Sequence, residues 1–300
     1  MINGIINVYK EKGYTSHDVV AKLRGILKQK KIGHTGTLDP DAEGVLPVCL
    51  GKATKLCDML TDKDKTYVAD LLLGMETDTQ DTSGKVIARY PVTCNEKQVE
   101  EAIYSFLGTY EQIPPMYSAL KVNGKKLYEL AREGKVVERK PRTVKILDIQ
   151  IIEMNLPFVK IKVSCSKGTY IRTLCHDIGQ KLGCGGCMSS LLRTKVSSFV
   201  LDESVTLDEI AKAVSEQKVW NYITRIDEMF RTYESVSVKP EYSKLLYNGN
   251  AFYQEHCLKG DNVTGGVVRV YDFEDQFVGI YEWKEEEQGY FPVKIFWEIN

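Results

Sequence analysis

The sequence has no long apolar run, and this absence limits what the chain can be. No stretch approaches the ~20 consecutive apolar residues that a membrane-spanning helix needs. The first residues, Met1-Ile2-Asn3-Gly4, also lack the basic segment and apolar core of a secretory signal. Both absences argue against a membrane or secreted protein, so we expect a cytoplasmic protein with no membrane association.

Cofactor-binding motifs are missing too. The sequence contains no Walker motif and no dinucleotide-binding fingerprint. Its eight cysteines are scattered without a secretion signal, which favours reduced thiols over disulfides. Cys184 and Cys187 have a C-x-x-C spacing, with Cys175 and His176 nearby, but one such pair does not complete a tetrahedral zinc site. We therefore expect neither a metal nor a cofactor.

Positive charge is in short supply overall, but it is unevenly distributed. The formal net charge is −1, from 40 Lys and Arg against 41 Asp and Glu. Residues 231–300 hold 7 basic and 12 acidic residues, which leaves 33 basic and 29 acidic residues in positions 1–230. Residues 121–145 alone contain nine Lys or Arg and three Glu. Such a segment is either a solvated loop or a surface that neutralises nucleic-acid phosphates.

The most informative stretch is Gly33-His34-Thr35-Gly36-Thr37-Leu38-Asp39-Pro40, which displays an imidazole and a carboxylate on one loop. Two glycines flank His34, and Pro40 restricts the backbone directly after Asp39. Residues 45–50 form an apolar run that predicts a buried strand, and loops anchored by strands commonly carry catalytic residues. Because Asp-Pro is a common turn, however, Asp39 taken alone is most simply a turn residue.

Residues 33–55 as a whole resemble the signature of the TruB-type family of bacterial tRNA pseudouridine synthases. Three further segments resemble motifs of that family, in the same order: Lys65-Thr66-Tyr67, residues 113–121 (IPPMYSALK) and residues 165–172 (CSKGTYIR). Near the N-terminus the family usually has a proline where this chain has Glu11, which leaves the exact position of Lys10 open. Four motifs in the expected order make a chance resemblance a poor explanation.

The resemblance implies an α+β fold, the pseudouridine synthase fold, in which helices flank a central sheet that is mixed and mostly antiparallel. A chain of 300 residues that is 43% hydrophobic can bury a sizeable core and is long enough for two domains. From about Tyr233 the pattern changes to short strands and turns, which resembles a PUA domain, a small β-rich RNA-binding module. We predict a catalytic domain in residues 1–230 and a PUA-like domain in residues 231–300.

The family isomerises the uridine at position 55 in the T-loop of tRNA to pseudouridine. The bond from ribose C1′ to uracil N1 breaks and C1′ joins C5, without redox change, so no cofactor is needed. By resemblance Asp39 is the reacting carboxylate, which attacks C1′, adds to uracil C6 or removes the 2′ proton. The stacked target base must first be flipped out. The implied partner is the T-arm of tRNA, with no obligatory protein partner, and we expect a monomer.

The resemblance also assigns roles to other residues. Arg172 is expected beside Asp39, where a guanidinium lowers the pKa of a carboxyl and holds its geometry. Tyr67 is expected to stack on the uracil, with its hydroxyl assisting removal of the C5 proton. His34 fills the space that the flipped base leaves, or else orients its own loop by hydrogen bonds. The other expected substrate-binding residues are Tyr170 and Leu191 in the base pocket, Lys10, and the basic residues Lys121, Arg139, Lys140 and Arg142.

Two other functions use the same surfaces. One is a non-catalytic RNA-binding or tRNA-folding protein, and the other is an enzyme related to the guide-RNA-dependent pseudouridine synthases. A protein that only binds RNA has no need of Asp39, because a carboxylate facing RNA repels phosphate. The guide-dependent alternative is disfavoured because the segments that recognise the T-loop are present in the sequence.

Hydrophobic periodicity predicts the elements that carry these residues. Ser16 is expected to cap a helix with Val19, Val20 and Leu23 on its apolar face. Further helices are expected in residues 53–60, 95–106, 125–133 and 169–182, and strands in residues 65–74, 144–153 and 158–166. The basic connection at residues 134–142 has no apolar anchor of its own.

Overall fold

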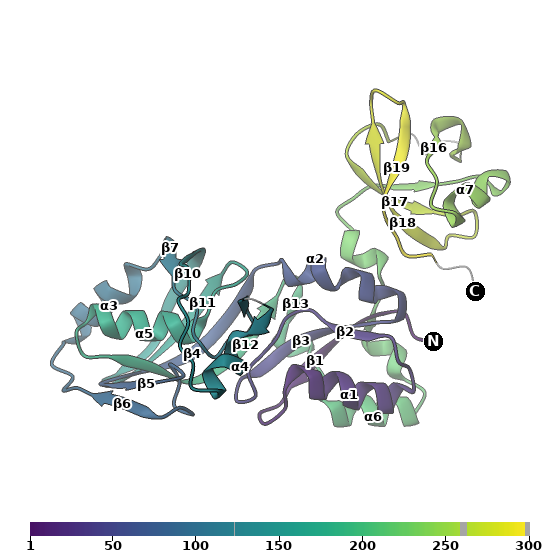
Figure 1. Ribbon diagram of the computed structural model, residues 1–300. Helices are drawn as coiled ribbons and strands as arrows, with labels where there is room; N and C mark the ends of the chain where they lie inside the picture. Colours follow the sequence, from purple (N-terminus) through teal and green to yellow (C-terminus); the bar gives the residue numbers. More distant parts are fainter. Residues whose placement is uncertain (123, 259–262, 298–300) are drawn as a thin grey trace.

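The computed structural model describes residues 1–122, 124–258 and 263–297, and one ten-stranded sheet is its largest feature (Figure 1). From one edge to the other its strands are β14 (Ile223–Thr224), β1 (Gly4–Lys10), β3 (Glu43–Leu50), β12 (Gly186–Val196), β4 (Lys65–Leu73), β11 (Phe158–Cys165), β10 (Arg142–Asn155) and β7 (Gly108–Gln112). β2 (Ile32–His34) pairs with β3, and β13 (Phe199–Val200) pairs with β12. The predicted α+β architecture with a mixed, mostly antiparallel sheet is confirmed.

The pairing of β3 with β12 differs from the antiparallel pairing elsewhere in the sheet. These two strands are parallel and pair over two positions, Glu43 with Leu192 and Gly44 with Arg193. Gly44 has a φ of +103°, and a Cβ built on it would lie 2.2 Å from the carbonyl oxygen of Arg193. Only glycine allows this close approach, because any side chain would push the strands apart. The loop that carries His34 and Asp39 enters β3 at this junction.

Helices cover the two halves of the sheet on either side of the junction (Figure 1). α1 (Ser16–Leu27) and α6 (Leu207–Ser215) pack on the β1–β3 half, whereas α3 (Glu96–Tyr104) and α5 (Ile171–Lys181) pack on the half that ends at β7. Val19 and Leu23 of α1 are fully buried in a core with Leu46 of β3. Burying each such side chain stabilises the fold by roughly 1.5–3 kcal/mol. The predicted apolar face of α1 is confirmed.

The start of α1 differs from the prediction. Thr15, not Ser16, is the N-cap residue: its hydroxyl accepts from Asp18 N–H at 3.1 Å, while the Asp18 carboxylate accepts from Thr15 N–H at 2.8 Å. This reciprocal pair is a capping box. Ser16 is fully buried, and its Oγ instead accepts from the N–H of Leu38 at 2.9 Å. Two adjacent hydroxyl residues are equivalent as caps in a sequence, and here the second one fastens α1 to the loop that carries Asp39.

Most predicted elements are present with small shifts at their ends. The strands expected in residues 65–74, 144–153 and 158–166 are β4, β10 and β11, and the helices expected in 95–106 and 169–182 are α3 and α5. Two other predicted helices are shorter. Residues 53–60 form a 3-10 helix (Gly51–Leu56) followed by α2 (Cys57–Thr61), and residues 125–133 form β9 (Lys125–Lys126) followed by α4 (Leu127–Arg132). The hydrophobic pattern did not predict β12.

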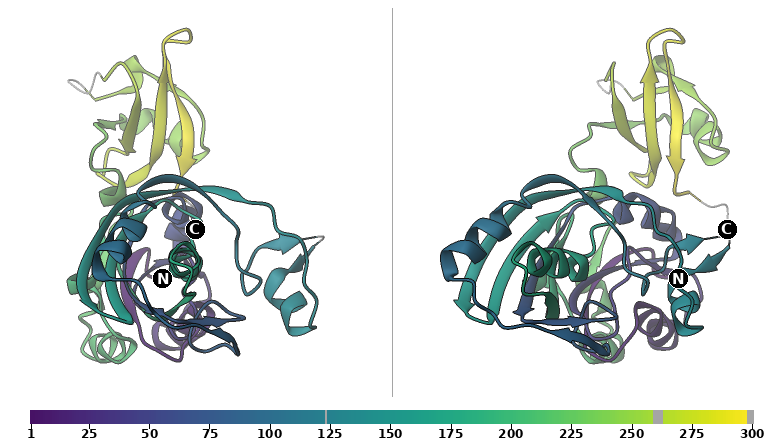
Figure 2. Two further views of the ribbon diagram at one scale, coloured as in Figure 1. Left: turned by 90° about the vertical axis from the view of Figure 1, so that its left-hand side faces the viewer. Right: turned by 60° about the vertical axis from the view of Figure 1, so that its left-hand side comes forward.

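A long excursion, residues 113–141, leaves the sheet between β7 and β10; we call it the arm. Its two ends are neighbours, because Gln112 and Arg142 pair in the β7–β10 register. The arm contains β8 (Lys121–Val122), β9 and α4, and Figure 2 shows it projecting from the body of the molecule. Val137 packs on a small cluster with Leu127 and Leu130 of α4. The expectation that residues 134–142 lack an apolar anchor is therefore wrong.

The C-terminal part forms a second sheet of five strands. Their order is β15 (Ser235–Ser237), β17 (Val267–Tyr271), β18 (Phe277–Lys284), β19 (Gly289–Ile295) and β16 (Phe252–Tyr253), with α7 (Ser243–Tyr247) beside them (Figure 1). The expected change to a β-rich pattern is confirmed. Among the described residues, no helix has the length and apolar character required to cross a membrane.

The two sheets share an apolar core. Phe296 of the C-terminal part belongs to the same buried cluster as Ile5 of β1, and the partly buried Phe277 packs against this cluster. Beside this cluster, Lys55 Nζ donates to the carbonyl oxygen of Ile295 at 2.9 Å. The C-terminal sheet is thus packed on the first one and is not held by a linker alone.

Candidate active site

The loop between β2 and β3 is held to the sheet at both ends. His34, the last residue of β2, pairs with Val48, and the N–H and hydroxyl of buried Thr35 both donate to the Pro47 carbonyl, at 3.2 and 3.1 Å. The Asp39-Pro40 turn closes with a bond from Ala42 N–H to the Asp39 carbonyl at 3.1 Å. The sequence thus folds locally into a turn that presents the Asp39 side chain, which is 44% exposed.

Lys10 holds this loop from one side. Its side chain is completely buried, and Nζ donates to the carbonyls of Pro40, Ala42 and Glu11 at 3.1, 2.5 and 3.1 Å. Burial lowers the pKa of Lys10 to about 8, although Glu43 and Asp39 favour its charged form. We expected Lys10 to bind the substrate. The structure instead buries its side chain beneath the loop, away from solvent. Glu11, in place of proline, does not prevent this arrangement.

Arg193 of β12 holds the loop from the other side, and it was missing from the predicted site. The side chain is 1% exposed; Nε donates to the Val45 carbonyl at 2.7 Å and Nη2 to the Gly36 carbonyl at 3.3 Å. The guanidinium also lies beside Tyr67, the neighbour of Arg193 in the β12–β4 register. The available signal was its place two residues after Leu191, but recognising it required knowing that residues 186–196 form a strand.

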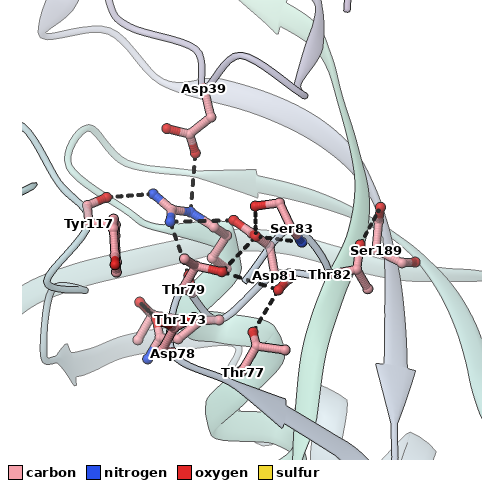
Figure 3. Close-up of polar contacts among 12 residues, drawn as sticks. Asp39, Thr77, Asp78, Thr79, Asp81, Thr82, Ser83, Tyr117, Thr173 and Ser189 are labelled. Carbon is pink, nitrogen blue, oxygen red and sulfur yellow. Dashed lines mark hydrogen bonds and ion pairs between the residues drawn. The ribbon is translucent and has the colours of Figure 1, made fainter. Parts of the chain in front are cut away.

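Arg172 of α5 is the direct partner of Asp39, as the resemblance implied. Its Nε lies 3.1 Å from Asp39 Oδ2, and its side chain is 6% exposed. Nη1 donates to the Thr79 carbonyl at 3.0 Å, and Nη2 donates to the Tyr117 carbonyl at 2.8 Å. Figure 3 shows Asp39 on one side of the guanidinium, with Tyr117, Thr79 and Asp81 around it. These two bonds hold the guanidinium in place independently of its contact with Asp39.

Asp81 is a second carboxylate at Arg172, and it was not among the predicted site residues. It lies between β5 (Met75–Thr77) and β6 (Val86–Arg89), and its Oδ2 is 3.4 Å from Arg172 Nη1 (Figure 3). Its other oxygen accepts from the Thr79 hydroxyl at 2.7 Å and from Ser83 N–H at 3.0 Å. Asp81 is thereby aimed at Arg172 by its own turn. The turn-rich composition of residues 77–84 gave no sign of this contact.

The pKa of Asp39 is raised from its usual value, which differs from the expectation based on Arg172 alone. Removal of water from the carboxyl raises the pKa, Arg172 opposes this effect, and Asp81 adds to it. The influence of Arg172 has the predicted direction, but burial outweighs it. A carboxylate in this setting is more basic than one in water, while the ion pair keeps its orientation.

The three residues expected around the base lie on adjoining elements. Tyr67 of β4 is 8% exposed, and burial raises the pKa of its hydroxyl to about 12, so it is a neutral phenol at pH 7. Half-buried Leu191 packs on the same apolar core as Tyr67 and Leu38. Half-buried Tyr170 is the N-cap residue of α5. The fold thus brings Tyr67 and Leu191 to the loop, and Tyr170 to Arg172.

His34 lies at the start of the loop, next to His17 of α1. Its half-buried ring contacts His17 edge to face, with centroids 5.2 Å apart, and Nδ1 accepts from Gly36 N–H at 3.4 Å. The pKa of His34 is lowered by burial and by the neighbouring His17 and Arg193. The imidazole is therefore neutral at pH 7, with Nε2 as its N–H.

The four basic residues predicted to bind phosphate fall into two groups. Lys121, Lys140 and Arg142 are exposed on the arm and at its end. Arg139 is half-buried, and its Nη1 donates to the Pro114 carbonyl at 3.1 Å. Arg139 therefore braces the arm, whereas the other three side chains face solvent.

The cysteines do not form a metal site in the described part of the chain. Cys184 and Cys187 are both buried as free thiols, and no group of three or more His, Cys, Asp or Glu side chains in residues 1–122, 124–258 and 263–297 is arranged to hold a metal ion.

Comparison with known families finds matches along most of the chain. Residues 24–171 match the N-terminal domain of the TruB family pseudouridylate synthases, and residues 172–236 match the C-terminal domain of tRNA pseudouridylate synthase B. The chain is 56% identical over 306 residues to the tRNA pseudouridine synthase B of Lachnoclostridium phytofermentans, a match that covers 98% of this chain and 100% of the relative. It is 47% identical over 297 residues to that of Alkaliphilus oremlandii, covering 98% and 97%.

The chain is also similar to solved structures over nearly its whole length. The chain is similar to one in a Cbf5-Nop10-Gar1 complex, with a TM-score of 0.71 and 28% identity, covering 98% of this chain and 84% of the other. It is also similar to a chain in an H/ACA RNP bound to a substrate RNA containing 2′-deoxyuridine, with a TM-score of 0.71 and 25% identity, covering 98% and 85%.

Proposed function

The chain belongs to the TruB family of pseudouridine synthases and isomerises uridine to pseudouridine in tRNA, and we propose that it acts on uridine 55 of the T-loop with Asp39 as the reacting carboxylate. The observation that carries this proposal is the ion pair between Asp39 and Arg172, which joins the β2–β3 loop to the start of α5 at 3.1 Å. One half-exposed carboxylate is thus held among buried groups and aimed by a fixed cation.

The reaction needs an ionised carboxylate close to the ribose of the flipped nucleotide. Asp39 acts either as a nucleophile, on C1′ or on uracil C6, or as a base that removes the 2′ proton, and each route releases uracil from C1′ so that it can turn and bond through C5. The C5 proton then leaves, N1 ends protonated, and a proton removed from C2′ returns there, so the atoms balance without a co-reactant. A carboxylate with a raised pKa favours either role, because it is a stronger base than a solvated one.

Tyr67 and His34 are proposed to serve the base. Tyr67 presents its ring to the uracil, and its hydroxyl lies near the Arg193 guanidinium. Because that hydroxyl is a neutral phenol at pH 7, we propose that it first acts as a hydrogen-bond donor. The neutral ring of His34 occupies the space left by the flipped base, where a charged imidazolium would be costly to stack. Tyr170 and Leu191 complete the pocket wall.

The rest of the chain is proposed to hold the tRNA. We divide it into a catalytic domain at residues 1–230 and a PUA-like RNA-binding domain at 231–300, and we assign T-arm contact to Lys121, Lys140 and Arg142. A cytoplasmic monomer with no obligatory protein partner fits a free tRNA substrate. The full-length similarity to tRNA pseudouridine synthase B at 56% identity supports this reading over the guide-dependent alternative.

The proposal is tested by incubating the protein with an unmodified tRNA transcript and mapping pseudouridine chemically. We expect stoichiometric pseudouridine at position 55 and none in a transcript with cytidine at that position. Modification elsewhere, with uridine 55 intact, would overturn the assigned substrate. Binding without any modification would favour the non-catalytic alternative.

A further inference from the structure

Gln112 is a buried polar residue at the point where the arm leaves β7. It is 1% exposed, and its side-chain polar atoms are bonded on both sides. Oε1 accepts from Tyr170 N–H at 2.8 Å, and Nε2 donates to the Tyr170 carbonyl at 3.0 Å. Nε2 also donates to the hydroxyl of Tyr110. One side-chain amide therefore grips both backbone polar groups of a single residue.

The residue that it grips is the starting point of α5. Tyr170 is the N-cap residue, no side chain caps this helix, and the Tyr170 carbonyl also accepts the helical bond from Leu174 N–H at 3.1 Å. A planar amide bonded at two points fixes the direction of the chain as well as its position. Arg172 lies in the first turn of α5. The orientation of the backbone at Tyr170 therefore determines where the Arg172 guanidinium lies.

The same two segments are joined again nearby. Nη2 of Arg172 donates to the Tyr117 carbonyl at 2.8 Å. Residues 112–117 at the base of the arm and residues 170–172 at the start of α5 therefore form one connected unit. Asp39 meets this unit through Arg172.

We propose that Gln112 is a positioning residue for the reaction, which sets the Tyr170 ring and the Arg172 guanidinium against Asp39. This role rests on the proposed function of Asp39 and Arg172. The buried position alone does not explain why a glutamine is there, because an apolar side chain would fill the same space without the cost of desolvating an amide. The β7–β10 ladder, which runs over five residue pairs, fixes the strand independently of this amide. What the amide adds is the two-point link to Tyr170.

Gln112→Met tests the proposal, because methionine keeps the length of the side chain and removes both bonds to Tyr170. Single-turnover rates at saturating tRNA and tRNA affinity are measured separately, well below the unfolding temperature. We expect the rate to fall roughly tenfold or more, as small misplacements at a reacting centre do, while the dissociation constant stays within about threefold. A rate within about twofold of the unmodified protein would overturn the proposal.

Val144→Ala is the matched control. Val144 is 3% exposed and pairs with Tyr110 in the same ladder, so its truncation lowers stability beside Gln112 without touching the amide. Its rate should be unchanged; equal slowing of both variants would assign the effect to stability and overturn the proposal. If the methionine chain does not fold, Gln112→Glu, which keeps the size and the acceptor, should slow the reaction by about threefold or more, and full activity would overturn the proposal.

The outcome is distinguishable from failure of the proposed function. If that function is wrong, the unmodified protein forms no pseudouridine at position 55. If only this inference is wrong, the unmodified protein forms it and Gln112→Met reacts at the same rate.

Discussion

The cations of the catalytic centre and those of the arm have opposite surroundings. Lys10 and Arg193 are 0% and 1% exposed, and they donate to backbone carbonyls of the loop that presents Asp39. Lys121, Lys140 and Arg142 are exposed. Since a buried charge is costly unless it is bonded, the inner cations are committed to the loop, and only the outer ones remain available for phosphate. Burial, and not residue type, separates the cations that hold the loop from those that we propose to contact the tRNA.

Among the cations, the largest effect is expected at Arg172, which is buried like Lys10 and Arg193. Arg172→Met leaves the carboxylates of Asp39 and Asp81 close together without the cation between them. The pKa of Asp39 should rise further, and turnover should fall by about a thousandfold or more. Single-turnover assays at pH 7 would measure this. Activity within about tenfold of the unmodified protein would mean that Asp39 is oriented by other groups.

Tyr67 comes next, because it neighbours the buried cation Arg193 and is proposed to stack on the base. Tyr67→Phe keeps the ring and removes the hydroxyl, and Tyr67→Leu removes the ring as well. We expect a loss of about a hundredfold for Phe and a larger loss for Leu in the same assay. A fully active Phe variant would confine Tyr67 to packing.

A moderate effect, on stability and not on tRNA binding, is expected at Lys10. Its folded pKa is about 8 against an ordinary value of 10.5, so between these pH values the unfolded chain holds a proton that the folded chain has released. The free energy of unfolding should therefore rise with pH across this window, by the linkage relation. Lys10→Met should lose that part of the rise, while Lys12→Met, at an exposed position, should keep it. Urea unfolding at pH 7.5 and 10 would measure this change in the free energy of unfolding. An equal change in the unmodified protein and in both variants would contradict the prediction.

The smallest effect is expected from the outer cations. Replacing Lys121, Lys140 and Arg142 by Gln should weaken tRNA binding and make the slope of log affinity against log salt shallower by roughly 2, since each lost phosphate contact contributes about 0.7–0.9. The rate at saturating tRNA should not change. A control with the same charge change, at exposed positions away from the arm, replaces Lys97, Lys212 and Lys218. If the two triple variants had equal slopes of log affinity against log salt, the basic residues of the arm would be a solvated surface and not a phosphate-binding one.

The sequence was sufficient for the parts of the site that depend on local order. Glycine and proline around Asp39 predicted its loop, the apolar run at residues 45–50 predicted β3, and the position of Arg172 at a helix start was visible from periodicity. These signals come from neighbouring residues, so one chain contains them. The family resemblance then supplied the pairing of Asp39 with Arg172, which local order alone does not give.

The parts that were not predicted depend on partners distant in the chain. β12 has register irregularities between Met188 and Ser190 and between Arg193 and Lys195, which interrupt the alternation that marks a strand. Its buried cation, Arg193, was consequently not among the predicted site residues. Lys10 is ambiguous for the same reason, because its burial is set by the carbonyls of Pro40 and Ala42. Exposure of a cation is a tertiary property, and no local pattern encodes it.

The most direct test of the account is the single-turnover rate of Asp39→Asn on unmodified tRNA. Asparagine keeps the size of the side chain and removes its charge, so binding should stay near normal while pseudouridine formation at position 55 falls to that of a buffer control. Asp41→Asn, two residues away and exposed, should react like the unmodified protein. Pseudouridine formed by Asp39→Asn above the buffer control would contradict the assignment of Asp39 as the reacting carboxylate.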